Sequence, residues 1–243
     1  MKTKKTTPPS SSDNPQKLTI TVNLPTAWTG LTSHQLRYLC TLLASGHFTT
    51  DEVKAYFLIR LTGVAGLIHP ERLVLTLGTL IANLDFIDQP PIAPVRYDRV
   101  GQTTPVHPLL SGTPFRSYLE VENYYQGYLQ SRNPEALDAL GAILYPGHTA
   151  TFTPDERYML LLWLVGMKQQ YTDLFPDLFR QSATTDPDDL PDPRDIMNAE
   201  IRALTAGDIT KTEAVLSADT LTALTELNAK AREARELERK TKV

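Results

Sequence analysis

A segment rich in proline and aspartate divides this chain of 243 residues into two unequal parts. Residues 184–193 read TTDPDDLPDP, which leaves almost no large apolar side chain. A stretch of this composition cannot bury enough apolar surface to order itself. The sequence therefore predicts a body over residues 17–180, an acidic linker over residues 181–193 and a C-terminal amphipathic helical arm over residues 194–243.

The overall composition is that of a globular protein with an acidic balance. Apolar residues make up 41% and charged residues 21%, which allows a sizeable core. The net charge of −4 argues against a nucleic-acid partner, because binding phosphate needs a basic face. The single cysteine, Cys40, excludes an internal disulfide framework and lies in an apolar helical run. We therefore expect a buried structural thiol there.

The N-terminal residues predict a tail and not an export signal. Residues 1–16 hold Lys2, Lys4 and Lys5 followed by threonine, proline and serine, without the apolar run of a signal peptide. We therefore expect a disordered basic tail. The longest apolar stretch, residues 159–167, is far shorter than the roughly 20 residues that cross a bilayer. These features predict a cytoplasmic protein without a membrane partner.

Helix start signals dominate the body, so the predicted fold class is mainly α. Capping boxes combine a hydroxyl residue with Gln or Glu three positions later, and prolines occupy first helical positions. The clearest signal is Thr153–Glu156, and the helix after it is apolar on most faces, as expected for the central element of the core. Helices are expected over residues 34–45, 51–61, about 71–83, from 115, 134–144 and 154–171.

Two short regions carry β signals. Lys17–Asn23 alternates apolar and polar residues and predicts one N-terminal strand. Residues 89–114 are rich in proline, and within them Val95–Val100 and Thr104–Val106 could pair as a small β-hairpin. Its prolines would restrict both strands to edge positions. The expected body is therefore a multi-helix unit with one strand and this small hairpin.

The arm reads as three helices, of which the last carries an apolar seam. The first is expected over residues 195–204, a short one is capped over residues 210–213, and the last starts at Ser217. An amphipathic helix of this kind can bind a partner through its apolar face. The predicted partner-binding residues are Leu221, Leu224, Leu227 and Ala231.

No constellation of catalytic or metal-binding residues emerges from the sequence. The five histidines lack the spacing that places two imidazoles on one zinc ion. Gly63–Gly66 lacks the lysine and hydroxyl of a phosphate-binding loop, and the linker aspartates lack the glycine and distal glutamate of a calcium loop. We therefore predict a protein that is not an enzyme, with no catalytic residue, no cofactor and no metal site.

Two binding hypotheses remain beside ordinary packing. The helices over 34–45 and 51–61 are joined closely enough for a helix-turn-helix, but Asp51 and Glu52 weaken the second as a DNA reader. Packing of two ordinary helices is favoured. The aromatic stripe before residue 130 could line a pocket, while core or subunit contact is the favoured alternative. Its members are Phe115, Tyr118, Tyr124, Tyr125 and Tyr128.

Several segments resemble uncharacterised proteins of bacterial temperate phages. They are Leu24–Trp28, Leu31–Tyr38, Tyr124–Leu129 and Ala203–Lys211, and the similarity covers Leu18–Glu238. Small acidic helical proteins of such phages resemble tail assembly chaperones. The resemblance implies a non-enzymatic morphogenesis factor in the cytoplasm of the bacterial host, which binds an exposed helical structural protein such as a tape-measure protein.

Two alternatives to the chaperone hypothesis stay open. A virion structural subunit, such as a tail or connector component, would self-associate and remain in the particle. A regulatory DNA-binding protein would use the first two helices, and the charge balance argues against it. An enzyme is the class with the least support in the sequence.

Overall fold

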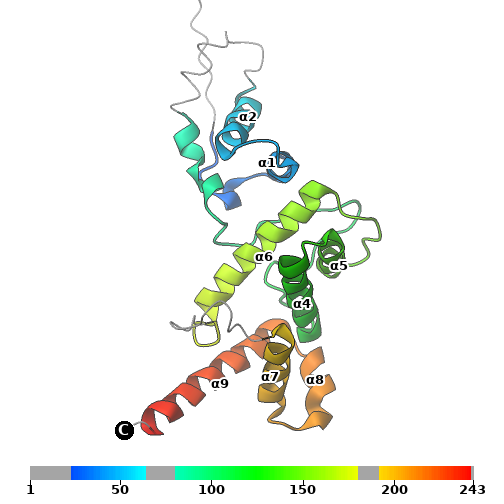
Figure 1. Ribbon diagram of the computed structural model, residues 1–243, viewed down its shortest axis with the longest axis vertical. Helices are drawn as coiled ribbons and strands as arrows, with labels where there is room; N and C mark the ends of the chain where they lie inside the picture. Colours follow the sequence, from blue (N-terminus) through cyan, green and yellow to red (C-terminus); the bar gives the residue numbers. More distant parts are fainter. Residues whose placement is uncertain (1–22, 64–79, 180–191, 242–243) are drawn as a thin grey trace, which may run out of the picture.

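The computed structural model describes residues 23–63, 80–179 and 192–241. Within these ranges the fold is mainly α, as the sequence predicts, and the molecule is elongated around the diagonal helix α6 (Figure 1). The expected N-terminal strand lies outside these ranges except for Asn23, which is irregular. Most of the helix expected over residues 71–83 also lies outside them. Its last part differs from the prediction, because Ala82–Asp88 forms the 3-10 helix η2.

An N-terminal layer of short helices covers one end of the molecule. It consists of η1 (Trp28–Gly30), α1 (Ser33–Ser45), α2 (Thr50–Thr62) and η2. A capping box opens both α1 and α2: the Thr32 N–H donates to Gln35 Oε1 at 2.8 Å, and the Thr49 N–H donates to Glu52 Oε2 at 2.8 Å. These bonds satisfy N–H groups that the first helical turn leaves free. Each of the two helices therefore starts within one residue of its predicted position.

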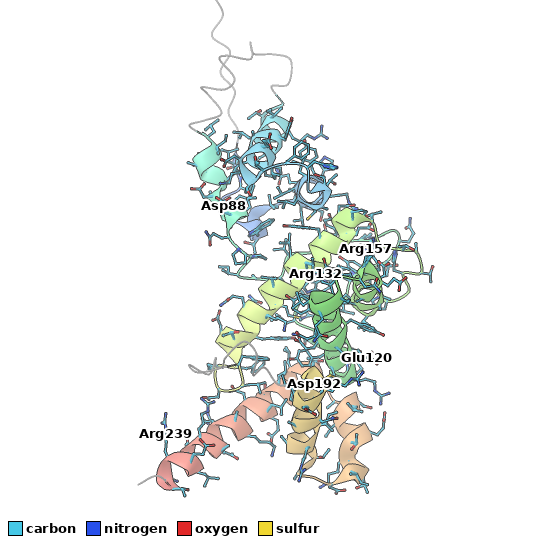
Figure 2. All side chains as sticks on the ribbon, in the orientation of Figure 1. Asp88, Glu120, Arg132, Arg157, Asp192 and Arg239 are labelled. Atoms are coloured by element: carbon cyan, nitrogen blue, oxygen red, sulfur yellow. The ribbon has the colours of Figure 1, made fainter. Side chains whose placement is uncertain are left out.

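The centre is a packed group of three helices. These are α4 (Phe115–Ser131), α5 (Pro134–Leu144) and α6 (Pro154–Leu174). α6 packs against α1 and α5, and α4 packs against α5. Arg157 on α6, labelled in Figure 2, donates to Asp138 on α5 at 2.6 Å. Buried Trp163, Met167 and Tyr171 make α6 the central core element, as predicted.

The connection from residue 89 to residue 114 is irregular, and the expected β-hairpin is absent from it. Val100 and Thr103 form an isolated antiparallel bridge that closes a tight turn at Gly101. The hairpin prediction is wrong because residues at the end of α5 take hydrogen bonds that a partner strand would need: the Val106 N–H donates to the Leu144 carbonyl at 2.9 Å, and the Tyr97 carbonyl accepts from the Tyr145 hydroxyl at 2.8 Å. Side chains of α6 hold the next part of the connection. The Trp163 indole N–H donates to the Pro108 carbonyl at 2.8 Å, and the Tyr171 hydroxyl donates to the Leu109 carbonyl at 2.8 Å.

The helices after the linker pack onto the body. They are α7 (Pro193–Thr205), η4 (Ile209–Lys211), α8 (Thr212–Ser217) and α9 (Thr220–Thr241). The last helix thus begins three residues after the predicted Ser217. Two backbone hydrogen bonds join this unit to the start of α4: Phe115 N–H to the Ala218 carbonyl at 2.8 Å, and Thr220 N–H to the Thr113 carbonyl at 2.9 Å. Its side chains Ala223, Leu224 and Leu227 belong to the same hydrophobic core as the body.

Candidate functional site

A cavity of about 970 Å³ lies where the C-terminal helices meet the body. We call it the α7–α9 cavity, because those two helices form most of its wall; α4, α6 and the turn at Leu178–Phe179 complete it. Figure 1 shows α7 and α9 diverging from their junction with α4. In Figure 2, Asp192 marks the start of α7, and Arg239 lies near the end of α9, far from the other labelled residues. Most of the wall is apolar, and its members include Leu119, Leu178, Phe179, Met197, Ala203 and Leu227.

The cavity opens to solvent along α7 and α9. Ile196 on α7 is 45% exposed although it lines the cavity, and Ala234 on α9 is also exposed. Exposed apolar side chains beside a concave apolar wall are typical of a surface that binds a ligand or a protein segment. The geometry therefore suits an elongated occupant that enters from this side.

The predicted partner-binding seam divides between the core and this cavity. Leu224 and Leu227 are 0% and 3% exposed, so both are buried against the chain's own side chains. Leu221 is half-buried and packs against the same core. Ala231 lines the cavity together with Leu227. The first part of the seam thus fixes α9 to the body, and only its continuation faces the open space.

The turn at Leu178–Phe179, which lines the cavity, is attached to α9 by polar contacts. The side-chain oxygen of Asn228 accepts from the backbone N–H groups of Asp177 and Leu178 at 2.8 and 3.0 Å. Arg235 Nη2 pairs with Asp177 Oδ1 at 2.7 Å. These contacts hold the Leu178–Phe179 wall against α9.

The two basic side chains among the described residues of the cavity wall, Lys168 and Lys230, are already paired with acids. Lys168 Nζ on α6 donates to Glu122 Oε1 on α4 at 2.6 Å, and the Gln126 amide donates to the same oxygen at 2.8 Å. Lys230 on α9 pairs with Glu226 at 3.3 Å. The contacts of Lys168 and Gln126 compensate the Glu122 carboxylate. Glu200 on α7 is a cavity carboxyl that has no such contact within the described residues.

Glu200 is the most unusual ionisable group of the cavity. It is half-buried, and among the described residues it makes neither a hydrogen bond nor an ion pair. Burial raises its pKa to about 7, the negative charge of Glu122 adds to this effect, and Lys168 opposes it. Tyr118, buried beside it, has a pKa well above the ordinary value, chiefly because of burial and then because of Glu200. A cation placed here would give Glu200 the ion-pair partner that the described part of the chain does not supply.

The position of Glu200 follows from the start of α7. The Asp192 side chain accepts from the Arg194 N–H at 2.8 Å, and proline at the first helical position fixes the backbone. The cavity-lining side chains Ile196, Glu200 and Ala203 then recur at helical spacing on one face. The sequence therefore contained a signal for this site, namely an acidic residue on the apolar face of a predicted helix.

The aromatic stripe does not act as one surface. Phe115 and Tyr118 are buried, Tyr125 and Tyr128 are half-buried, and Tyr124 is 37% exposed. Of these five, Tyr118 lines the α7–α9 cavity. The favoured alternative of a core contact therefore applies to the first two residues of the stripe.

The N-terminal helix pair packs as two ordinary helices joined by a short turn. Gly46 ends α1 in the left-handed conformation, with φ of 65°. Lys54, a cation of the second helix, is buried, and its Nζ lies 3.1 Å from Asp85 and 2.5 Å from Asp88. Lys54 is therefore paired inside the protein and does not face outward as a phosphate contact would.

The groups that could perform chemistry are dispersed or shielded. Cys40 is buried as predicted, and burial raises its pKa to about 12. Among residues 23–63, 80–179 and 192–241, no three His, Cys, Asp or Glu side chains form a group that could hold a metal ion. His148 has a buried Nε2 atom that finds no hydrogen-bond partner in the described part of the chain, and its ring centroid lies 4.5 Å from that of Phe152.

None of the helices in the described ranges combines the length and apolar character needed to cross a membrane. Comparison of the chain with protein-family models, with curated proteins and with solved structures found no match.

Proposed function

We propose that this protein is a non-enzymatic assembly factor of a temperate phage, acting as a tail-assembly chaperone in the cytoplasm of the host. Its role is to hold an exposed helical segment of a structural protein, such as a tape-measure protein, until assembly. The α7–α9 cavity is the observation that carries the proposal. It is apolar, open along two diverging helices and about 970 Å³ in volume.

Helix binding in an apolar groove explains this arrangement physically. An amphipathic helix buries the side chains of one face in such a groove, and its polar face stays in water. α7 and α9 supply two walls, and a third helix between them would cover Ile196 and Ala234. A chaperone for long apolar helices needs a surface of this kind, because those helices aggregate when they are left exposed.

Photo-crosslinking from the cavity tests the proposal. A benzophenone amino acid replaces Ala234 in the full chain, which is produced in cells that assemble the phage. A matched variant carries the same group at exposed Gln102, in the tight turn of the body. We expect the variant at residue 234, and not the one at residue 102, to capture a long helical structural protein. We also expect the chain described in this structure, unlike the captured structural protein, to be missing from purified particles.

Two results would contradict the proposal. Capture of the same proteins from both positions would show that the cavity is not the binding site. Capture of a second copy alone, together with the presence of the protein in finished particles, would favour a virion structural subunit.

A further inference from the structure

We infer that Glu200 recognises a lysine or arginine on the apolar face of the bound helix, so that the α7–α9 cavity selects amphipathic segments with one buried cation. This inference rests on the proposed function and deepens it. It commits to a partner of stated chemistry, since an entirely apolar helix would leave the Glu200 carboxylate buried without compensation.

The charges around Glu200 support a cationic partner. Glu122 and Tyr118 of α4, Lys168 of α6 and Lys230 of α9 line the same cavity. Lys168 is held 2.6 Å from Glu122, and Lys230 lies 3.3 Å from Glu226. Both lysines thus already have carboxylate partners. The cavity therefore keeps an excess of negative charge on α7, which carries Glu200 and also Asp195.

Burial makes this carboxyl selective. A hydrogen-bonded ion pair between Glu200 and a partner cation would form in a partly desolvated site, where such contacts are stronger than on an open surface. Because removal of one member of a desolvated pair leaves the other uncompensated, the site would reject a neutral residue at the matching position. The apolar wall would supply affinity, and Glu200 would supply selectivity and register.

The same arrangement couples binding to pH. The pKa of Glu200 in the free protein is about 7, so the carboxyl is largely protonated below that pH. A partner cation binds the ionised form, and binding then releases a proton below pH 7. Affinity for the cationic helix should therefore fall as the pH is lowered from 8 to 6, by roughly tenfold per pH unit once Glu200 is protonated.

The test uses the full chain with two designed peptides that differ at one position. Each is a stapled Leu/Ala/Gln helix of about 15 residues. One carries lysine in the centre of its apolar face, and the other carries glutamine there. Binding of both peptides is measured by fluorescence anisotropy for the wild-type protein, E200Q and E233Q. Glu233 is an exposed residue of α9, so E233Q removes the same charge outside the cavity.

We expect the wild-type protein and E233Q to prefer the lysine peptide by about tenfold at pH 8. E200Q should lose this preference and should bind the glutamine peptide at least as well as the wild type does. Equal binding of both peptides by wild type and E200Q would overturn the inference and leave the proposed function standing. Failure of the wild-type protein to bind either peptide would contradict helix binding itself.

Two further measurements separate other occupants. If Glu200 of the free chain titrates near 4.5 by NMR, its carboxyl is solvated or already paired within the protein, and the inference fails. If wild type dimerises in sedimentation experiments through Glu200, and E200Q is monomeric, the occupant is a second copy of this chain. That outcome would also overturn recognition of a separate partner.

Discussion

Gly166 lies where α6 crosses the backbone of Ala93, at the tightest approach to another segment among the glycines that the structure describes. A Cβ atom at this position would stand 2.1 Å from the Ala93 carbonyl oxygen, so the backbone itself would have to move. We predict that Gly166→Ala lowers the free energy of unfolding by about 2–3 kcal/mol, the usual cost of overpacking a core. Urea denaturation followed by circular dichroism measures this change.

Gly127 is the matched control for that substitution. It lies inside α4, and a Cβ atom there would meet nothing within 4 Å. Gly127→Ala should therefore stabilise the protein by up to about 1 kcal/mol, because alanine is the better helix former. Similar losses in both variants would show that close approach to Ala93 is not the cause.

Glu200 makes stability depend on pH in a direction unusual for a carboxyl group. Its folded pKa of about 7 exceeds its ordinary value of 4.5, so the folded state binds the proton more tightly. Its contribution is therefore favourable at low pH and is lost as the pH rises from about 4.5 through 7. We predict that E200Q equals wild type near pH 4.5 and is more stable at pH 8, by roughly 3 kcal/mol at most.

Thermal or urea unfolding of both proteins across this pH range provides the measurement. E233Q, which removes an exposed carboxylate from α9, serves as the comparison for net charge. A wild-type protein that gains stability relative to E200Q as the pH rises would disprove the raised pKa.

At the scale of single elements, Asp219 ties the start of α9 to the loop before α4. Its carboxylate accepts from the Gly112 N–H at 2.6 Å and from the Thr222 N–H at 3.0 Å. Burial opposes ionisation of Asp219, but these backbone hydrogen bonds prevail and lower its pKa below 3.8. Its stabilisation is thus present above that value and is lost as the pH falls through the folded pKa.

We predict that Asp219→Ala costs about 1–2 kcal/mol at pH 7, as the loss of a helix cap does, and increases hydrogen exchange in α9. Asp208→Ala is the control. Asp208 caps the short helix η4 by accepting from Thr210, and it makes no bond to α4 among the described residues. Equal exchange in α9 for both variants would indicate that the link to Gly112 does not hold this helix.

The elements that could be predicted are those specified by local chemistry. A hydroxyl at the cap and an acceptor three residues later mark α1, α2 and α6, and Asn133 with Pro134 marks α5. All of these helices start within one residue of the predicted position. Such signals act through neighbouring backbone groups, so they are readable without knowledge of the tertiary fold.

The features that the sequence did not reveal depend on contacts between distant residues. The alternation over Val95–Val100 suggested a strand, but the Tyr145 hydroxyl, at the end of α5, donates to the Tyr97 carbonyl within it. The seam on α9 suggested a free surface, but Leu224 and Leu227 fill space beside α4. An amphipathic helix shows which face is buried and does not show which neighbour buries it. For the same reason the sequence did not reveal the α7–α9 cavity, which forms only where side chains of several distant elements meet.

At the scale of the whole molecule, the C-terminal helices complete the core that the body begins. Tyr118 and Leu119 on α4 are buried and share the cavity wall with Leu227 on α9. A chain that ends at residue 180 would expose these side chains, each of which contributes about 1.5–3 kcal/mol when fully buried. We predict a lower urea midpoint and stronger binding of a hydrophobic dye for this shortened chain.

The opposite result would support the division that the sequence suggests. If the shortened chain unfolds at the same urea concentration as the full chain, the C-terminal helices form an independent arm. A mixture of the shortened chain with a peptide covering residues 194–243 tests the interface directly. Restored stability in that mixture would show that the two parts associate without a covalent link.

The packing of α1 on α6 has a consequence for synthesis on the ribosome. α1 buries Leu36, Leu39 and Cys40, and the helix it packs against begins only at Pro154. At translation rates of roughly 5–20 residues per second, α6 emerges on the order of 10 s after α1. During that interval the apolar face of α1 lacks its main cover and is open to cellular holding factors. α1 is thus made early, but its apolar face is fully covered only once α6 is available.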